Sequence, residues 1–249
     1  MKPTIYTITL FLFLHGFTIG QTVTGPDDNA KGKSFISLNG GMAMPMGKFA
    51  ATDFSSDASG YAKTGTHFAL EGAWFFSKHF GVGGSFATST FAVNVTPIAA
   101  GYLAAFDCDS ASAGSKPYRN VSFLIGPYFT CGLKKFSIDV HILGGITNTT
   151  SPNIFTSVFN QQTGPTEGST STFVQTSSSA NAFGFQAGLG VRYSVCKHLA
   201  ICLGGNYFTS KPQLTYQMVG LVNDVGHTPT GYNQAISGIS TTLGIGYEF

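Results

Sequence analysis

The side chains of this sequence that could do chemistry are few, and they share one positional pattern. Each lies in a stretch where apolar residues recur at every second position, and each stands on the opposite face, among small and polar residues. They are Glu71, Asp139, Arg192 and Glu248, with His67 and His141. A guanidinium can hold two carboxylates by charge-assisted hydrogen bonds, and buried charges need such partners.

We predict that Glu71, Asp139, His141, Arg192 and Glu248 form a charge cluster inside a lumen. In this interpretation Arg192 bridges two or more of the acids near one end, with Glu71 at a different depth, and the cluster blocks the lumen. The alternative is a charged constriction that selects small solutes or ions in a narrow pore.

Catalysis by these residues is not expected. Ser137, Asp139 and His141 share one face of a stretch, but neighbours two apart on a strand are about 6.6–7 Å apart. A catalytic base must reach its nucleophile at about 3 Å.

The sequence contains four cysteines, Cys108, Cys131, Cys196 and Cys202. They show neither Cys-x-x-Cys nor another zinc spacing, and their disulfide state stays open. The sequence predicts no enzyme, no cofactor and no metal site.

The stretch that shows most clearly how such residues are positioned is the last one, 234–249. One face carries Phe249, Tyr247, Ile245, Leu243, Thr241 and Ile239, and the other carries Glu248, Gly246, Gly244, Thr242, Ser240 and Gly238. Side chains on a strand alternate between its two faces. An apolar outer face, a small polar inner face and aromatic residues near one end are what a membrane-spanning barrel strand requires.

Seven further stretches alternate in a similar way, which predicts eight strands: 34–44, 66–76, 80–93, 120–131, 136–147, 183–193, 199–207 and 234–249. Pro127 weakens the fourth because proline removes a ladder donor. The connections between strands alternate strictly between tight turns that contain lysine and long segments at 45–65, 94–119, 148–180 and 209–233. Outer-membrane barrels have this asymmetry, with short periplasmic turns and longer extracellular loops.

The predicted fold is therefore all-β, an eight-stranded antiparallel up-and-down transmembrane β-barrel over residues 34–249. It must close because an open sheet edge would leave backbone groups unpaired in hydrocarbon. Eight strands leave an interior just wide enough for side chains to fill. An even number of strands places both termini on the same side, and the short turns identify that side as the periplasmic one. A soluble β-sandwich is the structural rival.

Composition agrees with this fold. Charged residues make up 10% of the 249, glycine accounts for 32, and the mean hydropathy is only +0.16. Beyond the N-terminus no apolar run approaches the ~20 residues of a membrane helix. Residues 1–20 have the charged start, apolar run and small residues of a signal peptide, and 21–33 form a flexible periplasmic leader. A net charge of +2 gives no basic patch for nucleic acid.

Four parts of the chain together carry a resemblance to a known family. They are Gly40-Gly41 followed by Pro45-Met46-Gly47-Lys48-Phe49, the hairpin at 74–84, the stretch from Gly184 to Tyr193, and the ending from Gly244 to Phe249. The chain resembles the OmpA/OmpX-like eight-stranded barrels, and more closely the Bacteroidota-type outer-membrane β-barrel (porin-like) family. The resemblance implies an integral protein of the bacterial outer membrane in contact with outer-membrane lipid, and we expect it to be a monomer. The resemblance also implies that the barrel assembly machinery reads Tyr247 and Phe249.

Such families are functionally diverse, so fold does not fix function. The expected role is structural or a cell-surface interaction through the long extracellular loops, where binding residues are more frequent than in walls. The segment 169–179 is polar and β-prone, and could extend the wall as a strand. The alternative is a narrow passive channel for small solutes, and the third interpretation is a barrel enzyme that modifies lipid A.

Overall fold

The computed structural model describes residues 32–106, 108–160, 169–220 and 229–249. The predicted signal peptide, 1–20, and all but the last two residues of the predicted leader, 21–33, lie outside the described residues.

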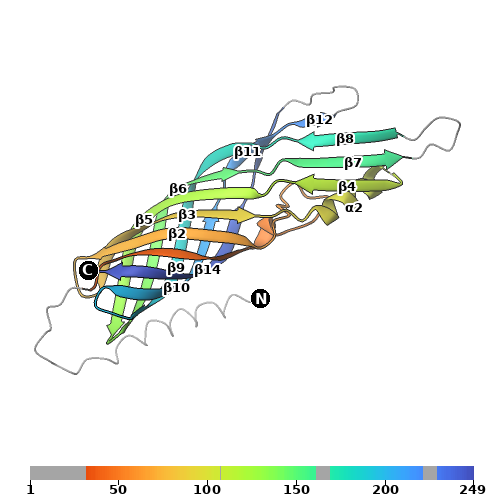
Figure 1. Cartoon of the computed structure of the whole chain (residues 1–249). Helices are drawn as coiled ribbons and strands as arrows, with labels where there is room; N and C mark the ends of the chain where they lie inside the picture. Colours follow the sequence, from red (N-terminus) through yellow and green to blue (C-terminus); the bar gives the residue numbers. More distant parts are fainter. Residues whose placement is uncertain (1–31, 107, 161–168, 221–228) are drawn as a thin grey trace, which may run out of the picture. The chain divides into compact units, whose positions relative to one another are not determined.

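Eight strands of the described part of the chain close into an antiparallel barrel in the order β1–β14–β10–β9–β6–β5–β3–β2 (Figure 1). They are β1 (Phe35–Pro45), β2 (Gly65–Phe75), β3 (Phe80–Phe91), β5 (Tyr118–Leu133), β6 (Phe136–Thr150), β9 (Ser179–Ser194), β10 (Leu199–Ser210) and β14 (Ile236–Glu248). The first and last strands complete the ring, pairing from Phe35 with Glu248 to Pro45 with Gly238. The predicted fold class is confirmed.

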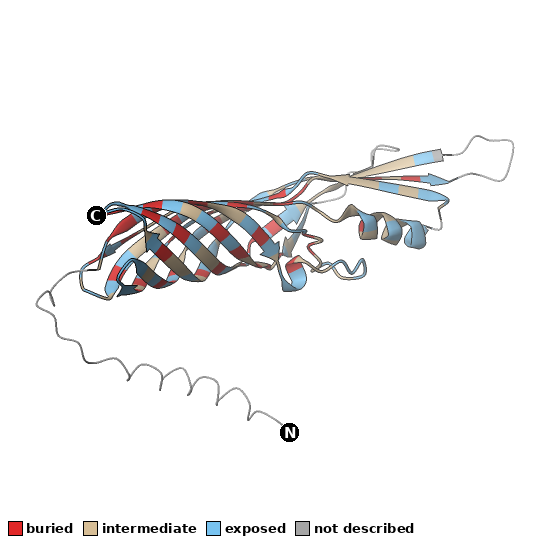
Figure 2. Cartoon of the chain, turned by 60° about the horizontal axis from the view of Figure 1, so that its bottom comes forward, coloured by how far each residue is buried: buried red, intermediate tan, exposed pale blue. Residues whose placement is uncertain are grey.

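The two faces of the wall differ in chemistry as the alternation predicted. Buried and exposed residues alternate along the barrel strands (Figure 2). Outward side chains such as Leu38 and Ile245 are each 62% exposed, whereas inward ones such as Ser37 and Asn39 are buried. A contiguous apolar surface of this kind is unfavourable in water and matches the lipid-facing band of a transmembrane barrel.

Pro127 interrupts the ladder locally without changing its register. On β5 the pairs with β6 stop at Ile125 with Gly144 and resume at Tyr128 with His141. The proline lacks an N–H to donate, so a short gap appears where the sequence predicted a weak strand. The pairing of β5 with β3 runs unbroken through the same position.

Tight turns join β2 to β3, β5 to β6 and β9 to β10, as predicted. In the second of these Lys134 takes a positive φ of 56°, the left-handed conformation that a short hairpin turn requires.

The long connections contain more secondary structure than the sequence indicated. They form η2 (Gly47–Phe49), α2 (Val95–Phe106), a four-stranded sheet in the order β12–β8–β7–β4, and the pair β11–β13. The sheet strands are β4 (Ser110–Ser115), β7 (Ile154–Asn160), β8 (Ser169–Gln175) and β12 (Met218–Gly220); the pair is β11 (Gln213–Tyr216) with β13 (Thr230–Asn233). The prediction of a strand within 169–179 is confirmed by β8. No helix of the described ranges is long and apolar enough to cross a membrane.

Proline marks three of the junctions between a wall strand and its continuation. Pro117 separates β4 from β5, Pro152 separates β6 from β7, and Pro212 separates β10 from β11. Hydrogen bonds nevertheless continue across two of the breaks, from Lys116 N to Asn153 O at 2.9 Å and from Ser151 N to Ser178 O at 2.8 Å. The sheet β4–β7–β8 therefore continues the wall beyond the barrel (Figure 1).

Candidate functional site

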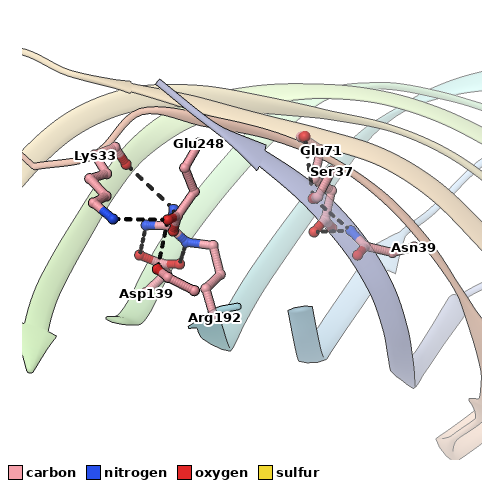
Figure 3. A network of polar contacts seen from close by, with 8 residues as sticks. Lys33, Ser37, Asn39, Glu71, Asp139, Arg192 and Glu248 are labelled. Carbon is pink, nitrogen blue, oxygen red and sulfur yellow. Dashed lines mark hydrogen bonds and ion pairs between the residues drawn. The ribbon is translucent and has the colours of Figure 1, made fainter. Parts of the chain in front are cut away.

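A salt-bridged cluster lies inside the barrel near the end that carries the tight turns. Arg192 of β9 binds Asp139 of β6 through Nε to Oδ2 at 2.6 Å and Nη2 to Oδ1 at 3.1 Å. Its Nη1 donates to Oε1 of Glu248, from β14, at 3.0 Å (Figure 3). The three side chains are between 1% and 4% exposed. One guanidinium thus holds two buried carboxylates from two other strands.

Neighbouring groups complete the partners of this cluster. Ser194 Oγ donates to Glu248 Oε2 at 2.7 Å, and the half-exposed Lys33 ammonium lies 3.3 Å from the same oxygen. The Phe35 ring lies 4.0 Å from Arg192 Cζ, in cation–π geometry. Buried ions are tolerated only when their charges are paired and their hydrogen bonds are made, and this arrangement meets both conditions.

The other two residues of the predicted cluster, Glu71 and His141, have different partners. Glu71 accepts hydrogen bonds from Asn39 Nδ2 at 3.0 Å and from Asn206 Nδ2 at 3.5 Å. The His141 ring stacks on Tyr128 with centroids 4.7 Å apart, and its Nε2 lies 3.2 Å from Gln186 Nε2. The lumen is therefore filled at two levels along the barrel. The first level is the salt-bridged cluster around Arg192, and the second consists mainly of amide side chains around Glu71.

Gly188 makes the close packing at this second level possible. A Cβ at this position would overlap both Asn206 Oδ1 and His141 Nε2. The alternation of the sequence places Asn39, Gln186 and Asn206 inside, but it does not reveal that the two asparagines converge on Glu71.

The space left between these side chains is small. One cavity of about 30 Å³ is lined by Glu71, His141 and Asn206 among others, and a second of about 10 Å³ is lined by His67 and Ser89. Each has room for about one water molecule. His67 Nδ1 lies 2.8 Å from Ser89 Oγ, a buried contact between β2 and β3 that the sequence reasoning did not identify.

An aromatic cluster fills the end of the barrel from which the long connections leave. Phe49 of η2 is fully buried and packs edge-to-face on Phe91 and Tyr118, with centroids 5.0 and 5.1 Å away. The backbone holds this segment through Ala62 N to Phe49 O at 3.0 Å. Sequence analysis placed Phe49 in a long loop and missed this role, because the residue lies outside the alternating stretches.

Beyond this aromatic cluster the long connections enclose a cleft of about 330 Å³. Among the described residues, five tyrosines line it: Tyr61, Tyr102, Tyr118, Tyr216 and Tyr232. Phe54 and Phe173 bring the number of lining rings to seven. Burial raises the pKa of Tyr232 to about 12, since the ionised phenolate loses hydration there. The available sequence signal was the concentration of tyrosine in segments that otherwise read as loops.

The remaining predictions concern the two aromatic residues at the C-terminal end, the four cysteines and metal binding. Tyr247 and Phe249 are exposed on the outer face with their rings stacked at 6.4 Å, and Phe249 N donates to Ser34 O at 2.9 Å. All four cysteines are free thiols, Cys202 within the lumen. In the residues that the structure describes, no group of three or more His, Cys, Asp or Glu side chains could hold a metal ion.

No known family model and no curated protein sequence matches the chain. Among solved structures it is similar to Ail, the attachment invasion locus protein of Yersinia pestis, with a TM-score of 0.44 and 16% identity over 88% of this chain and 100% of that one. It is similar to the outer membrane protein OprG from Pseudomonas aeruginosa, with a TM-score of 0.48 and 12% identity over 89% and 98%.

The outer membrane protease OmpT from Escherichia coli gives a TM-score of 0.42 and 10% identity over 92% of this chain and 99% of that one. These are distant similarities among outer-membrane proteins. The assignment of the barrel rests on the strand pairing within this chain.

Proposed function

We propose that this protein is a non-conducting integral barrel of the bacterial outer membrane with a role in cell-surface interaction. The observation that carries the proposal is the closure of the lumen at two depths. Phe49 with its aromatic neighbours fills one end, and the Arg192 salt bridges fill the other.

The narrow-channel alternative requires a continuous water-filled path. Between the two closures the lumen holds small cavities of about 30 and 10 Å³, each with room for about one water molecule. Conduction would need both closures to move. Buried ion pairs and packed aromatic rings resist such movement, because each leaves an unpaired charge or a void when displaced.

The surface role is supported by the order found in the long connections. They build a four-stranded sheet, a helix and an aromatic cleft on one end of the barrel. Binding residues are carried by loops on a rigid scaffold more often than by the scaffold itself. In this proposal the cleft end faces outward from the cell and both termini face the periplasm.

The membrane contacts follow from the outer face. Its apolar side chains would contact outer-membrane lipid, and the exposed Tyr247 and Phe249 would be read by the barrel assembly machinery. We propose a monomer, since closure of β1 on β14 leaves no wall strand unpaired.

The proposal is tested by single-channel conductance of the refolded mature protein, residues 21–249, in a planar bilayer. Heat-modifiable migration on a gel confirms beforehand that the barrel has folded. Wild type and Phe49→Ala should both be silent, because the ionic closure remains. A variant that also carries Asp139→Ala, Arg192→Ala and Glu248→Ala, which leaves space where the three side chains stood, should show a leak. Discrete openings of the wild type that change with Arg192→Ala would establish a channel instead.

We also propose that the protein is not an enzyme. The buried His67–Ser89 contact faces a cavity of about 10 Å³, too small to admit a lipid or peptide. Lipid A from a deletion strain, compared with the parent by mass spectrometry, should be unchanged; an altered acyl or phosphate pattern would contradict this.

A further inference from the structure

We propose that the cleft at the end of the barrel binds a neutral saccharide. This inference rests on the proposed surface-interaction function and specifies the chemistry of the partner. It draws on the charge of the cleft, the arrangement of its aromatic rings, its polar groups and its size.

The charge of the cleft argues against an anionic ligand. Among the described residues that line it, Asp57 is the one charged side chain, and no described lysine, arginine or histidine contributes to the lining. Phosphate, sulfate and carboxylate groups are normally bound by such basic side chains or by helix N-termini. A neutral ligand therefore fits this surface better than an acidic one.

Tyr102 and Phe173, which line the cleft, belong to a group of three near-parallel aromatic rings. Tyr102 and Phe106 of α2 and Phe173 of β8 are nearly parallel, with interplanar angles of 8° to 22° and all three centroid separations between 5.6 and 6.0 Å. Tyr102 and Phe173 are partly exposed and line the cleft, whereas Phe106 is exposed and lies outside the lining. Phe54 packs edge-on against Tyr102 at 5.4 Å.

The arrangement of these rings favours one of the ligand types that aromatic sites bind. A quaternary ammonium cage needs ring faces that surround the cation from several directions. The near-parallel rings of Tyr102 and Phe173 face one direction instead, and a ring face of this kind can stack on the flat, CH-rich face of a pyranose ring. Tyr216 and Tyr232, which also line the cleft, meet edge-to-face at 5.6 Å, and their phenol groups add polar atoms beside apolar surface.

Polar groups in the lining of the cleft can pair with sugar hydroxyls. Gln175, Gln234 and Asp57 line the cleft together with serine and threonine hydroxyls. Gln234 is held in place by Nε2 donating to Ala58 O at 3.3 Å. Amides and hydroxyls can donate and accept, as the hydroxyl groups of a saccharide require. The cleft volume of about 330 Å³ lies in the range of small-molecule sites.

The test is saturation-transfer difference NMR on the mature protein in phosphatidylglycerol nanodiscs. This lipid avoids both sugar-headed detergents and choline. The probes are glucose, N-acetylglucosamine, maltose, cellobiose and lactose, with choline chloride and glucose 6-phosphate as charge controls. At least one neutral sugar should show transfer to its ring CH protons, and should bind better than glucose 6-phosphate.

Variants assign the signal to the cleft. Tyr102→Ala should weaken binding by roughly tenfold or more, whereas Tyr102→Phe, which keeps the ring, should retain it. Leu103→Ala is the matched control, since Leu103 is exposed on the same helix and does not line the cleft. Heat-modifiable migration verifies the folding of each variant.

Two outcomes would overturn the inference. One is the absence of transfer to every neutral sugar. The other is binding of choline that is lost in Asp57→Asn, which would make the cleft a cation site. Neither outcome would contradict the proposal of a closed barrel, which is tested separately by conductance of the same preparation.

Discussion

Replacement of Arg192 by methionine tests whether the ionic closure of the lumen is dry. Methionine keeps much of the length of the side chain and removes its charge and donors. Asp139 and Glu248, at 4% and 1% exposure, would then lose three charge-assisted hydrogen bonds. Removal of one partner from a buried ion pair costs about 3–5 kcal/mol. At 1.4 kcal/mol per factor of ten, the folded-to-unfolded ratio should fall by roughly two to four powers of ten.

The two acids should not contribute equally to this loss. Glu248 still has Ser194 and Lys33 as partners, whereas both hydrogen bonds that the structure gives to the Asp139 carboxylate come from Arg192. Adding Asp139→Asn to Arg192→Met should therefore recover more stability than adding Glu248→Gln. The triple variant, which removes the charges of Asp139, Arg192 and Glu248 and leaves that of the half-exposed Lys33, should recover most of the loss.

The assay is equilibrium urea unfolding of the protein refolded in lipid vesicles, followed by fluorescence of Trp74. This is the single tryptophan of the chain and is 59% exposed on the lipid face, so its emission reports insertion. Arg119→Met is the matched control, because Arg119 is the other arginine and is exposed; it should change stability by less than about 0.5 kcal/mol. A loss below about 1 kcal/mol for Arg192→Met would show that the carboxylates are hydrated, and would refute the dry closure.

Three further predictions follow from the geometry. Gly188→Ala should cost about 1–3 kcal/mol in the same urea assay, because the new methyl overlaps His141; Gly205→Ala, where nothing lies within 4 Å, is its neutral control. Phe249→Ser should lower the amount of barrel assembled in cells without slowing refolding into detergent, as separate pulse-chase and refolding assays would show; equal effects in both would contradict an assembly signal. Tyr232 should titrate near pH 12 by ultraviolet absorbance. Because its folded pKa is above the unfolded value of about 10, its contribution to stability should be present below pH 10 and lost between pH 10 and 12, and Tyr232→Phe should abolish that step in thermal melting.

The sequence by itself determined the wall of the barrel. The eight alternating stretches end within a few residues of the observed strands, and the positions assigned to the inner and outer faces agree with the burial pattern. This information is local, because the alternation of side chains on a strand has a period of two residues. The tight turns also depend on local sequence, so their positions could be predicted as well.

Contacts within the lumen were only partly accessible from the pattern. Arg192, Asp139 and Glu248 are inward residues near the same end of their strands, so their meeting could be anticipated. The convergence of Asn39 and Asn206 on Glu71 could not, because it depends on the tilt and stagger of strands that are distant in sequence.

The tertiary structure alone decided the closure by Phe49 and the aromatic cleft. Phe49 lies outside any alternating stretch, and nothing in its local sequence indicates that η2 packs into the end of the barrel. The cleft joins residues from four separate connections, from Phe54 to Gln234, which come together only once the barrel is closed. Such contacts between distant segments depend on packing in three dimensions, for which a one-dimensional pattern has no signal.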